Sequence, residues 1–325
     1  MPVGRRAGTL SRWYFRVPAK LLVFLLVTFA TLFPNPAQLW RHVNRLVNLD
    51  RMIEPDAPGL SQWDTELAEL RTAAIEAREA SRGSMCGNIS RATDSEGGWI
   101  QAAVQQFVYG KVQYAWDWET WACADYIPTV EEMFERGRRS PEGQIREDCD
   151  GRAVMAASIM KRLGYEPRLV TDLRHVWVET PEGKWMGPGR QTTLVSTPTG
   201  VEVDFWGTLS NVPVSLSYGI AVFPFWREMI IAAAAYLLML HRRMNRMAAV
   251  MGGVLIVQGL LFMRLGFMAP QSVASEVSAW PSWLGMVHVA AALGVLLRAS
   301  YLARRRLLLR APGIEGGEVL GRRSF

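Results

Sequence analysis

The sequence predicts an α+β domain with an antiparallel sheet, flanked by one membrane-spanning helix on its N-terminal side and about three on its C-terminal side. Long apolar runs lie toward both ends of the 325-residue chain. Between them, a helical apolar pattern over residues 153–163 is followed by short stretches in which apolar and polar residues alternate. The chain is 50% hydrophobic, with a mean hydropathy of +0.06, which is high for a wholly soluble protein.

These patterns divide the chain into five expected segments. We expect a basic cytoplasmic tail and membrane anchor (1–40), a helical lead-in (41–98), the α+β domain (99–213), a three-helix membrane region (214–310) and a cytoplasmic tail (311–325).

The first membrane span is expected over residues 21–40, an uncharged run that follows several Arg and Lys residues. A run of about 20 apolar residues is long enough to cross a bilayer, and basic residues favour the cytoplasmic side. A cleavable signal peptide is the alternative. Because no small-x-small cleavage site follows the apolar core, an uncleaved anchor is preferred.

The lead-in is expected to contain an amphipathic helix over residues 61–82, because Trp63, Leu67, Leu70 and Ala74 recur at helical spacing. A loop rich in Gly, Ser, Asn and Asp follows, and a second helix is expected over residues 99–112.

Three further apolar runs, over residues 223–240, 247–267 and 280–297, predict three C-terminal spans. A basic turn after residue 240 and an Arg-rich stretch at 298–310 place both chain ends in the cytoplasm and the central domain on the other side. The net charge of +6 therefore indicates a lipid bilayer as partner, and no nucleic acid.

Cys149 and His175 are the candidate chemical residues. Cys149 lies at the predicted start of a helix that ends before Gly164, where unpaired backbone N–H groups favour a thiolate. His175 opens an apolar stretch with strand character, so we expect its imidazole to lie near the cysteine.

The runs Glu147-Asp148-Cys149-Asp150-Gly151-Arg152-Ala153, Leu163-Gly164-Tyr165 and His175-Val176-Trp177-Val178-Glu179 resemble, in order and spacing, the transglutaminase-like superfamily. This resemblance implies a papain-like fold with the nucleophile at a helix N-terminus. It also implies a Cys149 and His175 pair that acts on amide or ester bonds as a peptidase, amidase or acyl transferase. A protein or peptide substrate is then expected, and no metal or organic cofactor is implied.

One position departs from the family pattern. Where the family has an Asp before Pro, this chain has Gly187-Pro188, so the group that usually orients the histidine is missing there. Asp204 is the expected replacement, and Glu179 is the alternative candidate. The alternative function is a catalytically inactive peptide or envelope-ligand binding module, and a transporter or assembly subunit is a third reading.

Two further questions stay open at this level. Cys86 and Cys123 form a disulfide or remain unpaired, and no Cys-x-x-Cys or His-x-x-x-His spacing supports a metal site. Trp116 and Trp118 either line the cleft near a developing oxyanion or fill the core, and the backbone amide of Cys149 is another oxyanion donor.

Overall fold

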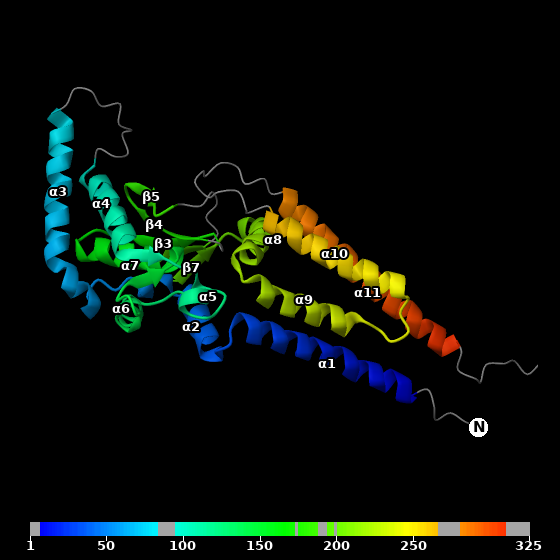
Figure 1. Ribbon diagram of the computed structural model, residues 1–325. Coiled ribbons are helices and arrows are strands. Elements are labelled where there is room, and N and C mark those ends of the chain that lie inside the picture. The colour runs from blue at the N-terminus through cyan, green and yellow to red at the C-terminus, as the bar shows by residue number, and fades with distance from the viewer. Residues whose placement is uncertain are drawn as a thin grey trace, which may run out of the picture. The chain divides into compact units, whose positions relative to one another are not determined.

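The computed structural model describes residues 7–83, 95–172, 175–187, 194–197, 200–265 and 280–309. The chain divides into two compact units. The central unit comprises residues 28–227, and the terminal unit comprises residues 1–27 together with 228–325 (Figure 1). The first helix, α1 (Ala7–Leu32), belongs to both.

The central unit is mostly helical, with two small sheets. Its described helices are α2 (Pro36–Leu46), η1 (Leu49–Met52), η2 (Pro58–Trp63), α3 (Asp64–Gly83), α4 (Glu96–Lys111), α5 (Asp117–Thr120), α6 (Val130–Arg139), α7 (Cys149–Arg162) and α8 (Phe205–Val222). The strands are β1 (Val112–Tyr114), β2 (Ile145–Glu147), β3 (Arg168–Thr171), β4 (Val176–Thr180), β5 (Gly183–Trp185), β6 (Leu194–Thr197) and β7 (Gly200–Val203).

The larger sheet has the strand order β5-β4-β3-β6-β7, and each neighbouring pair is antiparallel. Thr171 lies opposite Val176 at the turn between β3 and β4, and Val178 lies opposite Trp185 across β4 and β5. The smaller sheet pairs β1 with β2 in parallel. The antiparallel sheet expected from the sequence is therefore present, and β2 runs directly into α7.

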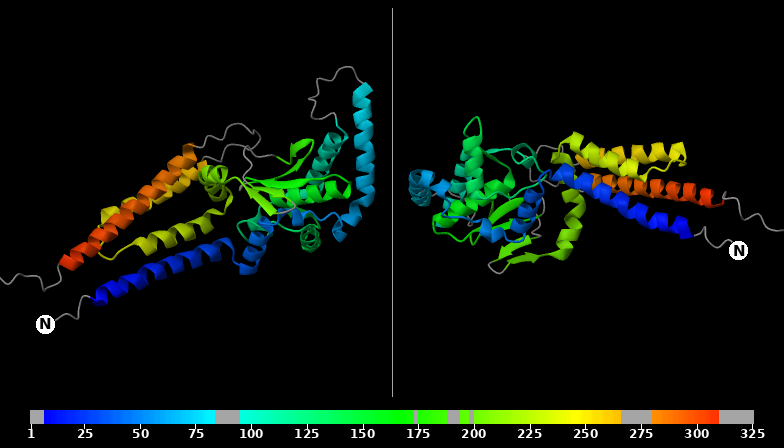
Figure 2. Two further views of the ribbon diagram at one scale, coloured as in Figure 1. Left: turned by 180° about the vertical axis from the view of Figure 1, so that it is seen from behind. Right: turned by 90° about the horizontal axis from the view of Figure 1, so that it is seen from below.

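The core of the central unit lies between the sheet and its helices. Helix α7 packs against β3 and β4, α4 packs against α7, and α3 packs against α4 (Figure 2). Trp177, Leu169, Ile159 and Met160 are fully buried there. Burial of these apolar side chains, each contributing about 1.5–3 kcal/mol, fixes the start of α7 against the sheet.

The first apolar run does not form one span from residue 21 to residue 40. Helix α1 ends at Leu32, and α2 starts separately at Pro36 with Asn35 as its N-cap. Proline at the first turn suits a helix start, and the Asn35 side chain accepts a hydrogen bond from the Ala37 amide. The candidate span is Phe15–Leu32, so it includes charged residues that the sequence placed before the membrane.

Helix α8 was not predicted, because the domain was expected to end near residue 213. Asp204 caps it, and the helix continues to Val222. Several of its large apolar side chains are exposed, among them Phe205, Trp206 and Leu209.

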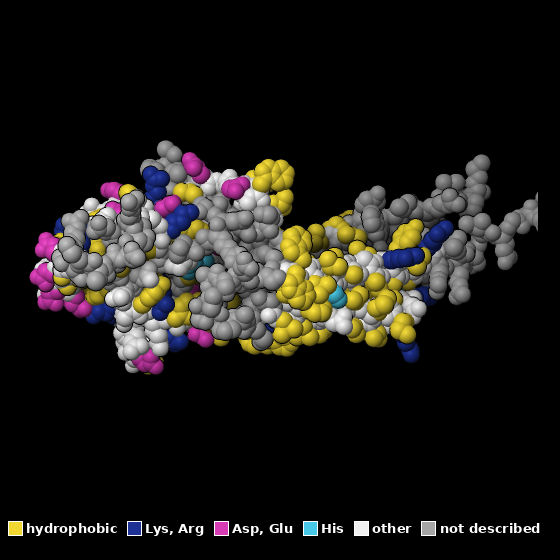
Figure 3. Space-filling model, turned by 90° about the horizontal axis from the view of Figure 1, so that it is seen from above, with side chains coloured by type: hydrophobic (Ala, Val, Ile, Leu, Met, Phe, Trp, Pro, Cys, Tyr) yellow, Lys and Arg dark blue, Asp and Glu magenta, His cyan; other side chains and the backbone are white. Residues whose placement is uncertain are grey.

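The terminal unit contains α9 (Phe225–Met239), which starts in the central unit, α10 (Arg246–Leu265) and α11 (Trp280–Leu309). Three helices are long and apolar enough to cross a membrane, and a fourth span results if the bent pair Ser215–Val222 and Phe225–Met239 counts as one. Hydrophobic side chains cover most of the visible face of α10 and α11 (Figure 3). The residues between the second and third C-terminal runs, 266–279, and the tail 311–325 lie outside the described residues.

Helices α10 and α11 pack closely through glycines. A side chain at Gly252 would collide with Leu296, and one at Gly259 would collide with Val289. Small residues at such positions allow membrane helices to approach each other. A buried ion pair lies within this unit. Arg264 Nη2 is 2.6 Å from Glu228 Oε2, so the pair joins the end of α10 to the first turn of α9.

Candidate active site

A cavity of about 250 Å³ in the central unit brings together Cys149 and His175. Its walls come from α2, α5 with the segments on either side of it, the start of α7, the β3–β4 turn and α8. The lining includes four carboxylates, two imidazoles, one thiol and several aromatic rings: Asp117, Asp125, Asp148, Asp150, His42, His175, Cys149, Trp116, Trp118, Tyr218 and Phe223.

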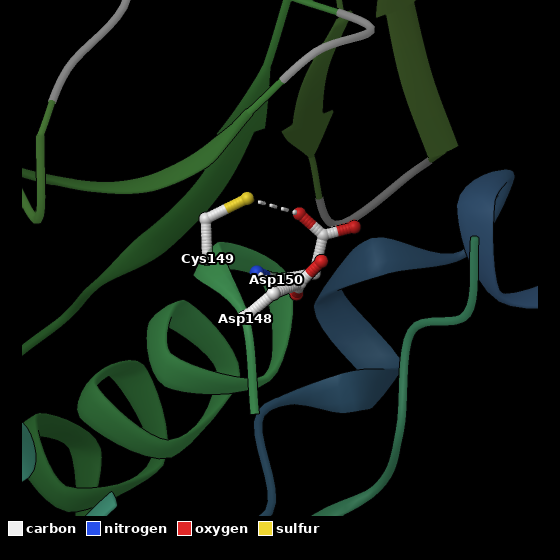
Figure 4. Close-up of side chains that lie close together, drawn as sticks. All are labelled: Asp148, Cys149 and Asp150. Carbon is white, nitrogen blue, oxygen red and sulfur yellow. Dashed lines mark hydrogen bonds between the residues drawn. The ribbon is translucent and has the colours of Figure 1, made fainter. Parts of the chain in front are cut away.

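Cys149 is the first residue of α7, as the sequence predicted. Asp148 is the N-cap, and its Oδ1 accepts a hydrogen bond from the Asp150 amide at 3.0 Å. Gly151 is required in this first turn because a Cβ there would lie 2.7 Å from the Glu147 side chain. The thiol points toward Asp150, with Sγ 3.2 Å from Oδ1 (Figure 4).

The electrostatics of Cys149 differ from the expectation of an activated thiolate. Burial raises the pKa of its thiol well above the usual value, and the negative charges of Asp150 and Asp148 raise it further. A hydrogen bond from the Val176 amide acts in the opposite direction. The N-terminus of α7 therefore does not outweigh desolvation and two adjacent carboxylates.

The carboxylates around Cys149 form a buried cluster, defined as Asp117, Glu147, Asp148 and Asp150. Burial and mutual repulsion raise the pKa of each carboxyl, and that of Asp148 rises to about 7. Neutral groups donate to the members: beside the Asp150 amide on Asp148 and the thiol on Asp150, Trp121 Nε1 donates to Glu147 at 3.1 Å and the Tyr126 amide donates to Asp117 at 2.6 Å. The site is thus strongly acidic on the side of the thiol.

His175 lies in the turn between β3 and β4, and its backbone amide donates to Asp172 Oδ1 at 3.1 Å. Its ring nitrogen Nε2 lies 2.9 Å from the carbonyl oxygen of Met186. Because a carbonyl only accepts, Nε2 carries the hydrogen in the neutral ring, and Nδ1 is the basic nitrogen.

Among the described residues, a backbone carbonyl, and no carboxylate, lies at the Nε2 side of the His175 ring. Met186 and Gly187 have φ angles of 64° and 75°, and this left-handed pair turns the Met186 carbonyl toward the imidazole. Gln105 Oε1 on α4 accepts the Met186 amide at 3.1 Å and fixes the turn. A Cβ at position 187 would lie 3.0 Å from His175 Nε2, so the missing side chain leaves the ring its room.

Asp204 does not orient His175, contrary to the sequence-based expectation. Its side chain caps α8 by accepting the Gly207 amide at 2.9 Å, and it is exposed. The physical reason is the strand order: β7, which precedes Asp204, lies three strands from β4, or about 14 Å across the sheet. Glu179 lies at the other end of β4, opposite Lys184, and is also not the orienting group.

His42 is the residue that sequence reasoning missed. It was not among the candidates from the sequence, but it is buried on α2 and lines the cavity. Its Nε2 lies 3.7 Å from Asp125 Oδ2, and its Nδ1 is buried without a hydrogen-bond partner in the described structure. A signal was available, because residues 36–46 have a strongly amphipathic pattern that suits a helix on a domain surface.

The aromatic residues have two different roles. Trp118 Nε1 donates to the Val222 carbonyl at 3.0 Å, so this indole ties the α5 region to the end of α8. Trp116 lines the cavity and contacts the rings of Tyr114 and Tyr218 edge to face. Both indoles line the cleft, and the N–H of Trp118 is already occupied by its hydrogen bond to the Val222 carbonyl.

Of the two cysteines Cys86 and Cys123, the structure describes only Cys123. Cys123 is buried with a free thiol, and burial raises its pKa to about 11. Cys86 lies outside the described residues, so a disulfide between Cys86 and Cys123 stays a prediction.

Comparisons with known proteins give no assignment. No family model matches the chain, and neither curated proteins nor solved structures provide a match. The function of the chain therefore has to be inferred from the residues that line the cavity.

Proposed function

We propose that this chain is a membrane-anchored thiol enzyme of the transglutaminase-like type, acting on amide or ester bonds of a protein or peptide. The observation that carries the proposal is the shared cavity of Cys149 and His175, in which the imidazole is held through Nε2 by the Met186 carbonyl. A cysteine with an oriented histidine is the arrangement that nucleophilic catalysis requires.

The chemistry follows from the tautomer. With its hydrogen on Nε2, His175 takes the thiol proton of Cys149 at Nδ1 as Sγ attacks the substrate carbonyl carbon. The resulting oxyanion is placed near the backbone amide of Cys149 at the start of α7. His175 then returns the proton to the departing amine or alcohol, leaving a thioester, and water or an amine completes hydrolysis or transfer.

The carbonyl of Met186 serves in place of a carboxylate for orientation but not for charge. An Asp-to-Asn change in a serine protease triad costs about 10⁴ in rate, largely because it selects the wrong tautomer. A carbonyl selects the productive tautomer, so the loss here is confined to the missing negative charge beside the imidazolium. We expect a competent but slow enzyme.

The membrane arrangement is part of the same proposal. The basic turn at Arg242, Arg243 and Arg246 and the Arg-rich end of α11 lie on the cytoplasmic side, with both chain ends. The central unit then acts outside the cytoplasm, on a substrate in that compartment.

A second candidate function is a binding module that holds a peptide or envelope ligand in the same cavity. The raised pKa of the Cys149 thiol favours it, because a binding protein does not need a thiolate. The two functions differ in whether His175 controls the reactivity of Cys149.

The test is alkylation of Cys149 by iodoacetamide in the full chain, purified in detergent with a metal chelator present. Peptide mass spectrometry reports Cys149 separately from the other cysteines. We expect His175→Ala to slow alkylation at neutral pH by roughly 10²-fold, because a general base contributes about 10²–10⁴. His241→Ala, outside the central unit, is the matched control.

An equal rate in wild type and His175→Ala, with both folded by circular dichroism, would contradict the enzyme and leave the binding module. The full chain is necessary because a fragment of residues 41–213 lacks the α8 side chains that line the cavity.

A further inference from the structure

The buried acidic cluster forms no close ion pair within the described residues, although the charges of Arg152 and Arg136 act on Asp148 and Glu147 at longer range. Asp117, Glu147, Asp148 and Asp150 are each at most 9% exposed. Within the described residues, none of the four forms an ion pair with Lys or Arg. Buried charges are strongly unfavourable unless they are neutralised, paired or bound to a metal. The cluster therefore requires either protons or a bound cation.

The side chains are spaced like metal ligands. One ligand atom each from Asp148, Cys149 and Asp150 lie within 4.8 Å of one another, and the same holds for Asp117, Glu147 and Asp148. The Cys149 Sγ to Asp150 Oδ1 separation is 3.2 Å (Figure 4). Two ligands on one tetrahedral zinc, at about 2.0 and 2.3 Å, are about 3.5 Å apart. The Cys149 and Asp150 ligand atoms therefore already have about the spacing of two ligands on one zinc ion.

A second observation, independent of this spacing, points to a ligand. Asp117 is 3% exposed and lines the cavity, yet its Oδ1 has no hydrogen-bond partner in the described structure. Its other oxygen is fixed by the Tyr126 amide, so the unpartnered oxygen is held in place beside the cluster. Native proteins rarely leave such an atom without a partner.

We propose that a divalent cation of the zinc class binds to Asp148, Cys149 and Asp150, with Asp117 adjacent, and that it switches off the thiol. This regulation rests on the proposed function of Cys149. Thiolate and carboxylate ligands together suit Zn²⁺. Binding releases the thiol proton and forms a bond from Sγ to the metal, so the sulfur lone pair is no longer available to attack a carbonyl. The usual spacing of Cys and His ligands does not identify this site, because its three ligands are consecutive residues.

The experiment uses the full chain in detergent after treatment with EDTA, with Zn²⁺ alone and Co²⁺ alone as probes. Calorimetry measures Zn²⁺ binding, and absorption spectroscopy detects the thiolate-to-cobalt charge-transfer band. We expect one Zn²⁺ per chain, release of a proton, a cobalt band, and at least a tenfold slower alkylation of Cys149 in the zinc form. Asp150→Asn weakens binding at least about tenfold, a loss typical of disrupted metal sites. Asp204→Asn, which changes an exposed capping carboxylate, leaves it unchanged.

Cobalt binding without a charge-transfer band, or zinc binding equal in Asp150→Asn and wild type, would overturn the proposal. So would a stripped wild-type chain that binds neither ion, in which case the carboxyls are neutralised by protons. The cobalt spectrum of the wild type decides the matter even if Asp150→Asn fails to fold. The proposed enzyme function fails separately, through the effect of His175→Ala in the metal-free chain.

Discussion

The two sides of the cavity are built in opposite ways. On the base side, Asp172 and the Met186 carbonyl hold His175 at its backbone and its ring, and Gln105 fixes the turn that presents the carbonyl. On the nucleophile side, Cys149 is surrounded by carboxylates that disfavour its thiolate.

The orientation of the His175 imidazole and the activation of the Cys149 thiol therefore depend on different features of the cavity. A motif in the sequence specifies which side chains meet, and rigid hydrogen bonds then orient the imidazole without any net charge. Activation of the thiol depends instead on the balance between burial, neighbouring carboxylates and the helix terminus. In this cavity the Met186 carbonyl fixes the His175 ring, while the neighbouring carboxylates raise the pKa of the Cys149 thiol.

Among changes that leave the Cys149 and His175 side chains in place, the largest effect is expected from Asp150→Asn, which changes only the side of the cavity around Cys149. The Asp150 carboxylate opposes the thiolate, so removing its charge lowers the pKa of Cys149. Below that pKa, each unit of decrease raises the thiolate fraction tenfold. We expect alkylation of Cys149, measured with a chelator from neutral to alkaline pH, to be roughly tenfold faster in the alkaline part of the profile, where the wild-type Asp150 carboxyl is ionised.

The matched control for this change is Glu179→Gln, which removes a carboxylate at the far end of β4. A pH profile of Asp150→Asn that coincides with the wild-type profile would show that the acidic cluster does not set the reactivity of Cys149.

Gly187→Ala tests the base side. The added Cβ lies 3.0 Å from His175 Nε2 and the φ angle of 75° is unfavourable for Ala, so the ring must move away from the Met186 carbonyl. A displaced side chain costs about 0.5–1.5 kcal/mol. We expect roughly a three- to tenfold slower alkylation with an unchanged circular dichroism spectrum. In the background of His175→Ala the same change has no effect on the rate, and an equal effect there would contradict the orientation argument.

Local patterns predicted the parts of this fold that depend on near neighbours. The helix that starts at Cys149 and stops before Gly164 is α7, and the alternating stretches around Leu169 and Trp177 are β3 and β4. Both follow from periodicity that burial on one face imposes. Gly187 was also singled out from the sequence, and it lies beside the His175 ring, where a Cβ would be 3.0 Å from Nε2.

The errors share a different cause, because each depended on the path of the chain in three dimensions. Asp204 follows the outermost strand, which the strand order places far from His175. His42 enters the cavity only because Pro34 and Pro36 end the first helix early and start a new one. The elevated pKa of Cys149 arises partly from its burial, which a linear motif does not encode.

His42→Gln tests the wall of the cavity that α2 supplies. Glutamine keeps a polar side chain but loses the ring that lies 3.7 Å from Asp125. Loss of one interaction of this kind costs about 0.5–1.5 kcal/mol, so we expect roughly a threefold change in the reactivity of Cys149. The control is His288→Gln on α11, in the terminal unit, which should leave the rate unchanged.

The smallest kinetic effect is expected from Asp204→Ala, which separates helix capping from catalysis. The change removes the side chain that accepts the Gly207 amide at the start of α8, and loss of an N-cap costs about 1 kcal/mol of stability. The melting temperature of the full chain in detergent should fall slightly, while alkylation of Cys149 stays at the wild-type rate. Asp204→Ser, which retains a capping oxygen, should restore the melting temperature. If Asp204→Ala instead slowed alkylation as strongly as His175→Ala, a carboxylate at 204 would be acting on the imidazole, and the Met186 carbonyl would not be the orienting group.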